Sequence, residues 1–212
     1  MRISILSLLI IGCVTLGHGQ ELRKIELEKP DKKRGLTVME ALSERQSQRE
    51  YADKPISSRD LSDLLWAAVG INRPESGKRT APTAMNRQEI DVYVCLPEGA
   101  YLYDAKAHAL LPVAKGDFRP VLAQQQAFVN AAPLCLVIVA DLSLFDGNDE
   151  NQKMLFGAMD AGIVSQNISL FCAAVKLATV PRAWMDRDAL KKAWNLKDSQ
   201  YPLLNHPVGY VK

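Results

Sequence analysis

The sequence predicts an α+β fold in a single domain, and three observations support this. Stretches with helical periodicity are separate from stretches with strand character, and the strands are grouped around one hairpin, which favours α+β over alternating βαβ units. Residues 134–140 are apolar throughout, as in a strand buried on both faces of a sheet. The chain has 212 residues, 48% of them hydrophobic, enough for one substantial core. The net charge is +2 without a basic block, so we expect no nucleic-acid partner.

The first twenty residues have the composition of a secretory signal. Arg2 precedes the apolar run Ile3–Leu16, and Gly17–Gly19 places small residues where a signal peptidase cleaves. The run is short for a transmembrane span. We expect a signal peptide at 1–20, a flexible leader at 21–35, a folded domain at 36–212, and export to the periplasm. Lipid anchoring at Cys13, which ends a lipobox-like Ile-Ile-Gly-Cys, is the alternative.

Two amphipathic helices are predicted in the first third of the chain. Thr37 begins one, Glu40 completes its capping box, and its apolar side holds Leu36, Met39 and Leu42. The other begins at Ser57 or Ser58 and ends at Gly70, with helical spacing of Leu61, Leu64, Leu65 and Ala68. Residues 73–85 are rich in proline and glycine and are expected to form a loop.

Strands and helices follow in the rest of the chain. Strands are expected at 90–96, at 134–140, in a hairpin of 100–103 with 109–113, and at 207–211. Helices are expected at 118–130, at 156–178, and from Asp186 or Asp188 to Trp194. The 156–178 segment is apolar around most of its circumference, so it must be buried in the core or against a partner subunit. The cysteines at 95, 135 and 172 lie in apolar runs and are expected to be core residues.

Arg45, Ser47 and Arg49 form the first candidate site. In a helix or in an extended chain, the two guanidiniums flank a hydroxyl, which suits a phosphate or another oxyanion. A solvated, charged helix end is the alternative. Sequence signatures of hydrolases, zinc proteases and dinucleotide-binding folds are absent, and no metal-ligand cluster is visible. His108 and His206 are expected to be structural, so an enzyme of this kind would rely on a bound organic cofactor.

Five segments, taken in order, resemble the flavin-dependent nitroreductase family. Arg45–Tyr51 resembles the family's R-x-S-x-R-x-aromatic segment, and Arg79–Asn86 resembles its R-x-A-P-S-A flavin loop. The others are Asp160–Asn167 in a long central helix, Thr179–Ala183 at the flavin edge, and the terminal strand Pro207–Tyr210. The sequence looks most like the SagB/ThcOx branch, the dehydrogenases of thiazole- and oxazole-forming peptide pathways.

The resemblance implies a nitroreductase-like fold and a flavin site. The fold would be a mixed, largely antiparallel sheet flanked by helices, with the long apolar helix at a homodimer interface and FMN bound between subunits. Arg45 and Ser47 would hold the phosphate or ribityl chain, and Arg49 the phosphate or the pyrimidine edge. The neighbouring subunit would contribute Pro82, Thr83, Ala84 and Asn86.

The same resemblance implies further contacts around the flavin ring. Backbone N–H groups near Arg182 and Ala183 would face N5, Pro181 would lie in the same loop along the flavin ring edge, and Lys212 would substitute for a basic tail that the family often has. Gln126 would touch the ring, with a polar helix face as the alternative. No side chain needs to act as a general acid or base, so the catalytic residue is left unknown.

Three departures from the family pattern stand out. The family's Asn-x-Gln-Pro-aromatic run is Asn86-Arg87-Gln88-Glu89-Ile90 here. Ala183 replaces a glycine and is followed by the bulky Trp184. The chain ends at Lys212, without the basic tail.

The expected function is that of an FMN-dependent oxidoreductase that reduces and then reoxidises its flavin in two steps. Nitro compounds or quinones are the candidate acceptors, and NAD(P)H is the candidate donor. Export conflicts with a cytoplasmic nicotinamide donor. The alternative is therefore an exported flavin- or small-ligand-binding protein of the same fold without NAD(P)H-driven turnover.

Overall fold

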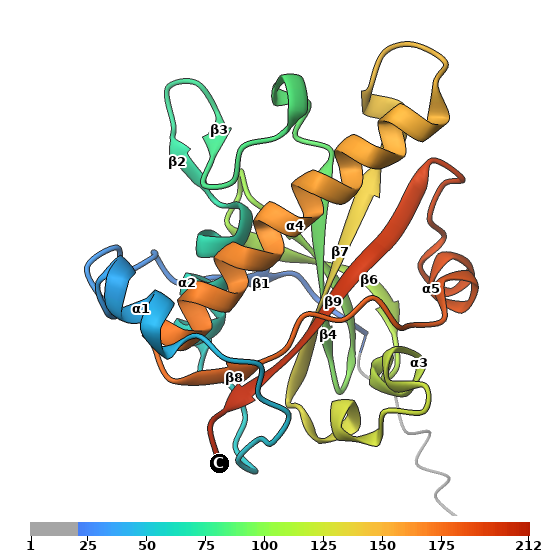
Figure 1. Ribbon diagram of the computed structural model, residues 1–212. Coiled ribbons are helices and arrows are strands. Elements are labelled where there is room, and N and C mark those ends of the chain that lie inside the picture. Colours follow the sequence, from blue (N-terminus) through green and yellow to red (C-terminus); the bar gives the residue numbers. More distant parts are fainter. Residues whose placement is uncertain (1–20) are drawn as a thin grey trace, which may run out of the picture.

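The computed structural model describes residues 21–212, and the expected signal peptide, its cleavage site and Cys13 lie outside the described residues. A seven-stranded sheet forms the centre, in the order β1-β6-β5-β4-β7-β9-β8, with every neighbouring pair antiparallel (Figure 1). Its strands are β1 (Ile25–Glu26), β4 (Ile90–Leu96), β5 (Gly99–Asp104), β6 (Ala109–Lys115), β7 (Leu134–Asp141), β8 (Leu177–Thr179) and β9 (Gln200–Tyr210). The predicted α+β fold with a largely antiparallel sheet is confirmed.

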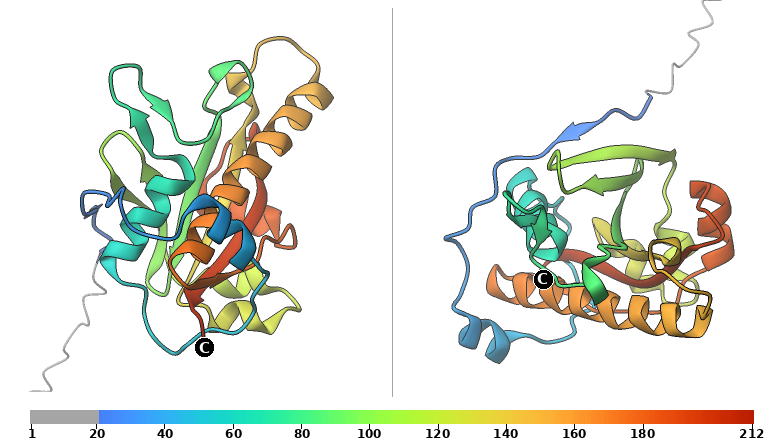
Figure 2. Two further views of the ribbon diagram at one scale, coloured as in Figure 1. Left: turned by 60° about the vertical axis from the view of Figure 1, so that its left-hand side comes forward. Right: turned by 90° about the horizontal axis from the view of Figure 1, so that it is seen from above.

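Helices cover both faces of this sheet (Figure 2). They are α1 (Val38–Glu44), α2 (Ser58–Val69), α3 (Arg119–Ala123), α4 (Glu150–Ala174) and α5 (Arg187–Trp194). Short 3₁₀ turns lie at η1 (Ala84–Asn86), η2 (Ala127–Ala131) and η3 (Leu142–Leu144), and a small hairpin joins β2 (Ile71–Arg73) to β3 (Lys78–Arg79). In the part of the chain that the structure describes, none of the helices has the length and apolarity needed to cross a lipid bilayer.

Strand alternation divides the interior into two cores. On β7, Leu136 and Ile138 face α2 and α4, whereas Val137 and Val139 face α3 and α5. Both sets are fully buried, as the uniformly apolar sequence of this strand predicts. The three cysteines are buried and free, which confirms their expected place in the core.

Several helix boundaries are set by the caps that the sequence predicts. Thr37 and Glu40 form the capping box of α1, Ser57 caps α2, Gly70 ends α2, and Asp186 caps α5. Strand β4 spans the predicted residues 90–96, and the predicted hairpin is β5–β6. These local signals are confirmed.

Residues 21–35, expected to be a flexible leader, make defined contacts with the folded domain. Residues 25–26 pair with β6, and Asp63 in α2 accepts the backbone N–H of Asp31 at 2.8 Å. The Arg34 guanidinium forms ion pairs with Asp60 at 2.5 Å and Asp63 at 2.9 Å. The charges of this stretch therefore dock it along α2.

Other boundaries differ from the prediction. The expected 118–130 helix is broken at Gln124, whose φ is 49°, into α3 and η2. The expected 156–178 helix begins at Glu150 and ends at Ala174, because Asp149 caps it and residues 177–179 form β8 instead. Strand β9 begins at Gln200, seven residues before the prediction. The apolar side chains of α1 are exposed, with only Ala41 buried in that helix.

Candidate functional site

The Arg45–Tyr51 segment lies along the end of the sheet. Helix α1 ends at Glu44, so the segment is not helical, and Arg45 serves as the helix C-cap. The backbone N–H of Gln48 donates to Thr179 O at 2.9 Å, and that of Ala52 donates to Tyr210 O at 2.9 Å. A Cβ at Gly209 would lie 2.8 Å from the Tyr51 ring, so glycine permits this close approach. The segment is thereby fixed beside β8 and the C-terminal end of β9.

The cationic side chains of this segment are available for an anion. Among residues 21–212, neither Arg45 nor Arg49 forms an ion pair with a carboxylate. A cavity of about 320 Å³ is lined by Gln48, Arg49, Glu50, Val211 and Lys212. Two of these residues are cations and one is a carboxylate. The fold therefore brings Lys212 next to Arg49, although the two residues are 163 positions apart in the sequence.

Arg182 anchors the neighbouring loop from inside. Only 7% of it is exposed, and its guanidinium donates to Gln126 Oε1 at 2.7 Å, Asn205 Oδ1 at 2.6 Å and Leu122 O at 3.1 Å. Its backbone N–H donates to Asn205 O at 2.9 Å. These bonds occupy both the side chain and the amide of Arg182, while Pro181 and Ala183 are exposed on either side. A backbone donor directed at a ligand from this loop would thus come from Ala183.

Phe128 joins three of the predicted segments, and sequence reasoning missed it. Its ring centroid lies 6.0 Å from the Arg49 guanidinium carbon and 5.7 Å from that of Arg182. Gln126, two residues earlier, is held by Arg182 through Oε1, which leaves its amide N–H₂ free to donate. The structure therefore gathers Arg49, Gln126 and Arg182 around one aromatic ring. No sequence signal marked Phe128, because the segment was expected to be one continuous helix.

The Pro82–Asn86 segment lies elsewhere on the same chain. It leads into η1, which sits by the N-terminal half of α4, at the end of the molecule opposite β8 and the C-terminus (Figure 1). The backbone N–H of Ala84 donates to Asp160 Oδ2 on α4 at 2.7 Å, and that of Gln88 donates to Thr83 Oγ1 at 2.8 Å. Within one chain the predicted site residues therefore form two separate groups.

The two histidines are held by hydroxyl groups, as expected. His206 is fully buried, with Ser165 Oγ at 2.8 Å and Thr179 Oγ1 at 3.2 Å from its ring nitrogens. Burial lowers the pKa of His206 to about 3, so the ring is neutral. His108 lies 2.8 Å from both Ser62 Oγ and Tyr103 Oη. In the described residues, no group of three His, Cys, Asp or Glu side chains is placed to hold a metal ion.

Comparisons with known proteins agree with this geometry. The model of the nitroreductase family matches residues 42–210. A candidate nitroreductase of Methanocaldococcus jannaschii is 29% identical over 194 residues, which cover 87% of this chain and 96% of the relative.

Solved structures give the same result. The crystal structure of a candidate nitroreductase from Ralstonia eutropha JMP134 has a TM-score of 0.85 and 36% identity, covering 93% of this chain and 92% of that one. A chain of the Escherichia coli microcin synthetase McbBCD complex shares the fold at a TM-score of 0.69 with 19% identity, covering 99% of this chain and 85% of that chain. The family model and the Ralstonia structure both cover most of the chain, and the chain therefore belongs to the nitroreductase family.

Proposed function

We propose that this protein is an FMN-dependent oxidoreductase that works as a homodimer. The observation that carries the proposal is the meeting of three distant segments at one end of the sheet: Arg45–Arg49, Pro181–Ala183 and Lys212. Among the described residues their cationic side chains have no carboxylate partners, and the exposed Ala183 offers a backbone donor. When bound there, FMN would supply the electron-transfer chemistry that no side chain of this chain offers.

The donor set fits a flavin mononucleotide. Two guanidiniums, the Ser47 hydroxyl and the Lys212 ammonium can bind a phosphate dianion through charge-assisted hydrogen bonds. The guanidinium carbons of Arg49 and Arg182 lie 6.0 and 5.7 Å from the Phe128 ring centroid, and with Arg49 at the pyrimidine edge rather than the phosphate they would place positive charge where a reduced flavin gains negative charge. The Ala183 N–H and the Gln126 amide would orient the ring, and Arg182 would keep both in place.

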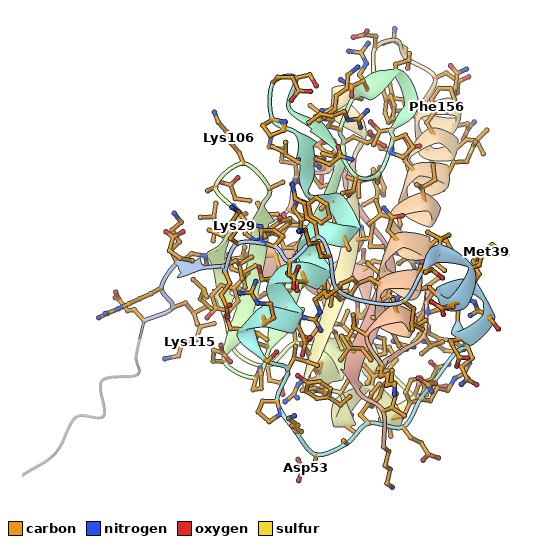
Figure 3. The ribbon with its side chains drawn as sticks, turned by 90° about the vertical axis from the view of Figure 1, so that its left-hand side faces the viewer. Lys29, Met39, Asp53, Lys106, Lys115 and Phe156 are labelled. Atoms are coloured by element: carbon orange, nitrogen blue, oxygen red, sulfur yellow. The ribbon has the colours of Figure 1, made fainter. Side chains whose placement is uncertain are left out.

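A second subunit would complete each site. The outer faces of α1 and α4 expose large apolar side chains, among them Met39 at 75% and Met159 at 58%. Figure 3 shows Met39 and Phe156 on the same side of the molecule, which places the outer parts of α1 and α4 on one surface. Large exposed apolar side chains gathered on one side of a molecule are typical of a protein interface. Pairing through it would bring Pro82–Asn86 of the partner subunit to the cofactor.

The acceptor class we propose is small nitro compounds or quinones. Such a flavin would be reduced by one substrate and reoxidised by the next, with NAD(P)H as the candidate donor. The similarity of the motifs to the SagB/ThcOx branch leaves oxidation of a peptide-derived azoline as a narrower form of this proposal. The proposal includes export, and it leaves either NAD(P)H or another reductant as the electron donor. The experiment below distinguishes the two donors.

Anaerobic reduction of the FMN-reconstituted protein tests this function. We expect a yellow, flavin-retaining protein that dithionite bleaches and that an added quinone or nitro compound reoxidises. Bleaching by NADPH would identify a nicotinamide donor, and bleaching by dithionite alone would point to another donor. A protein that binds no FMN contradicts the proposal, and one that binds FMN but is never reoxidised by an acceptor favours a binding protein.

The double substitution Arg45→Ala with Ser47→Ala tests the phosphate site. Removing two charge-assisted bonds should weaken FMN binding on the order of 10- to 100-fold. Arg73→Ala, in the exposed β2–β3 hairpin, is the matched control and should leave the affinity unchanged. Equal affinities of the double variant and the wild type would contradict the assignment.

A further inference from the structure

A buried pair of carboxyl groups lies beneath the loop formed by residues 82–88. Glu89 follows this loop directly, is only 1% exposed, and faces Asp160 of α4, which is 5% exposed. Neither Oε1 nor Oε2 of Glu89 has a hydrogen-bond donor from any other described residue. Buried oxygens without a donor are costly, and a carboxyl facing a carboxylate can be satisfied by one shared proton.

The charges around Glu89 support this protonation. Burial, together with the neighbouring Asp160 carboxyl, raises the pKa of Glu89 to about 8. The opposing charge is that of Arg79 in β3, whose guanidinium is committed to Ile90 O at 2.7 Å. From β7, the backbone N–H of Asp141 donates to Glu89 O at 2.9 Å, and the Asp141 carboxylate accepts from Ser143. No described residue donates to either Glu89 oxygen, and a proton held between the two carboxyls satisfies them.

The loop above the pair depends on Asp160. Three non-glycine residues of the loop, Met85, Asn86 and Gln88, have φ between 53° and 55°, a conformation that needs support from its surroundings. The bond from the Ala84 N–H to Asp160 Oδ2 ties this loop to α4. The other oxygen of Asp160 is then free to accept from a protonated Glu89.

We propose that Glu89 is a positioning residue: its proton, shared with Asp160, keeps loop 82–88 fixed on α4 in the conformation that meets the cofactor of the partner subunit. Its contact with the cofactor rests on the proposed function, whereas the hold on the loop does not. Loss of the proton to water leaves two buried negative charges side by side. Their repulsion turns Asp160 away from Ala84 and frees the loop.

Hydrogen exchange of loop 82–88 without FMN tests the hold on the loop. After correction for the intrinsic exchange rate, protection in the wild type should fall about tenfold per pH unit above about pH 8. We call this pH-dependent fall in protection the exchange step. Glu89→Gln should show no exchange step, because its amide does not titrate and still donates to Asp160. Asp91→Asn is the matched control: burial raises the pKa of Asp91 to about 6, but this carboxyl faces Arg79 and Asp141 rather than the loop, so the step should remain.

Three results would overturn the inference: no step in the wild type, a step that survives in Glu89→Gln, or a step that disappears in Asp91→Asn. If Glu89→Gln does not fold, Asp160→Asn replaces it. Its amide oxygen can still accept from Ala84, and removal of the adjacent charge should move the step to lower pH. An unmoved step in Asp160→Asn would then contradict the shared proton.

The FMN dissociation constant over the same pH range tests the link to the cofactor. It should rise above about pH 8 in the wild type and stay level in Glu89→Gln. Binding that does not depend on pH, with the exchange step present, would overturn the cofactor role alone. A protein with the exchange step that binds no FMN at any pH would show that the proposed function has failed while the loop hold stands.

Discussion

At the scale of single residues, Arg182 shows where sequence reasoning stops. The motif placed it correctly in the loop Thr179–Ala183, but its side chain turns inward to Gln126, Leu122 and Asn205. Burial lowers the pKa of this guanidinium, and no carboxylate among the described residues compensates its charge. The acceptors come from positions up to 60 residues away in sequence, so no local pattern could predict them.

Replacing Arg182 should destabilise the fold itself. Arg182→Leu would leave three acceptors without a donor, the buried Leu122 O and Asn205 Oδ1 and the half-buried Gln126 Oε1, and each buried loss costs about 1–3 kcal/mol before the surroundings relax. We therefore expect the free energy of unfolding to fall by about 2–4 kcal/mol in urea denaturation without FMN. Arg23→Leu, which removes an exposed arginine, should change it by less than about 0.5 kcal/mol. Equal effects of the two substitutions would show that the internal bonds of Arg182 contribute little.

Trp184 should select acceptors by size. It is 53% exposed and follows Ala183, and its carbonyl is fixed by the Asn205 amide at 3.1 Å. In Trp184→Ala, kcat/KM for a naphthoquinone should rise on the order of tenfold relative to a benzoquinone, with FMN affinity unchanged. The Ala107→Gly variant, in the distant β5–β6 turn, should keep the wild-type ratio. Parallel changes for both quinones in Trp184→Ala would argue against a steric role.

At the scale of elements, the sequence predicted correctly those helices and strands whose boundaries depend on neighbouring residues. Capping residues and strand alternation fixed α1, α2, α5, β4 and β7. The break between α3 and η2 follows instead from a tertiary contact. Arg182 donates to the Leu122 carbonyl, to which the Gln126 N–H would donate in a continuous helix, and that N–H donates to Ala123 O instead. Such competition is visible only in the folded chain.

The outer face of α4 should be a subunit interface. Met159→Glu would place a charge within an apolar surface that also includes Leu155 and Ile163. We expect the dimer to dissociate at concentrations where the wild type is dimeric, with a molar mass near that of one chain by light scattering and with weakened FMN binding. Ala107→Glu adds the same charge to an exposed turn and should leave the dimer intact. A dimeric Met159→Glu protein would place the interface elsewhere.

At the scale of the whole molecule, the sequence predicted the class of fold but not the order of its strands. Strand β9 lies between β7 and β8, and this pairing brings the C-terminus beside Arg45–Arg49. Long-range pairing of this kind leaves no local periodicity, so geometry alone reveals it. The family resemblance supplied both halves of the proposed site, and the structure shows that they lie apart on one chain.

Stability should decrease from mildly acidic to mildly alkaline pH because of one buried group. The pKa of Glu89 is about 8 in the folded chain against an ordinary value of 4.5, so between these values the folded state binds a proton that the unfolded state has lost. Stability therefore falls as pH rises through this range. His206 has the opposite effect, since its pKa is lowered from 6.5 to about 3 and stability falls as pH drops through that window. The pKa of Asp91 is raised from 3.8 to about 6, so this group adds to the loss of stability with rising pH only below about pH 6.

His206 contributes only below its ordinary pKa of 6.5, and Glu89 contributes up to its pKa of about 8. Between pH 6.5 and pH 8 the dependence of stability on pH should therefore come from Glu89. Allowing for water near the pair, the loss should be about 1–2 kcal/mol, which corresponds to a fall in Tm of about 3–6 °C. Thermal unfolding of the FMN-free protein at fixed ionic strength measures it. Glu89→Gln should remove the slope, whereas Asp91→Asn should retain it, because Asp91 has already ionised in both states over this interval. A slope shared by the wild type and Glu89→Gln would assign the titration to another group.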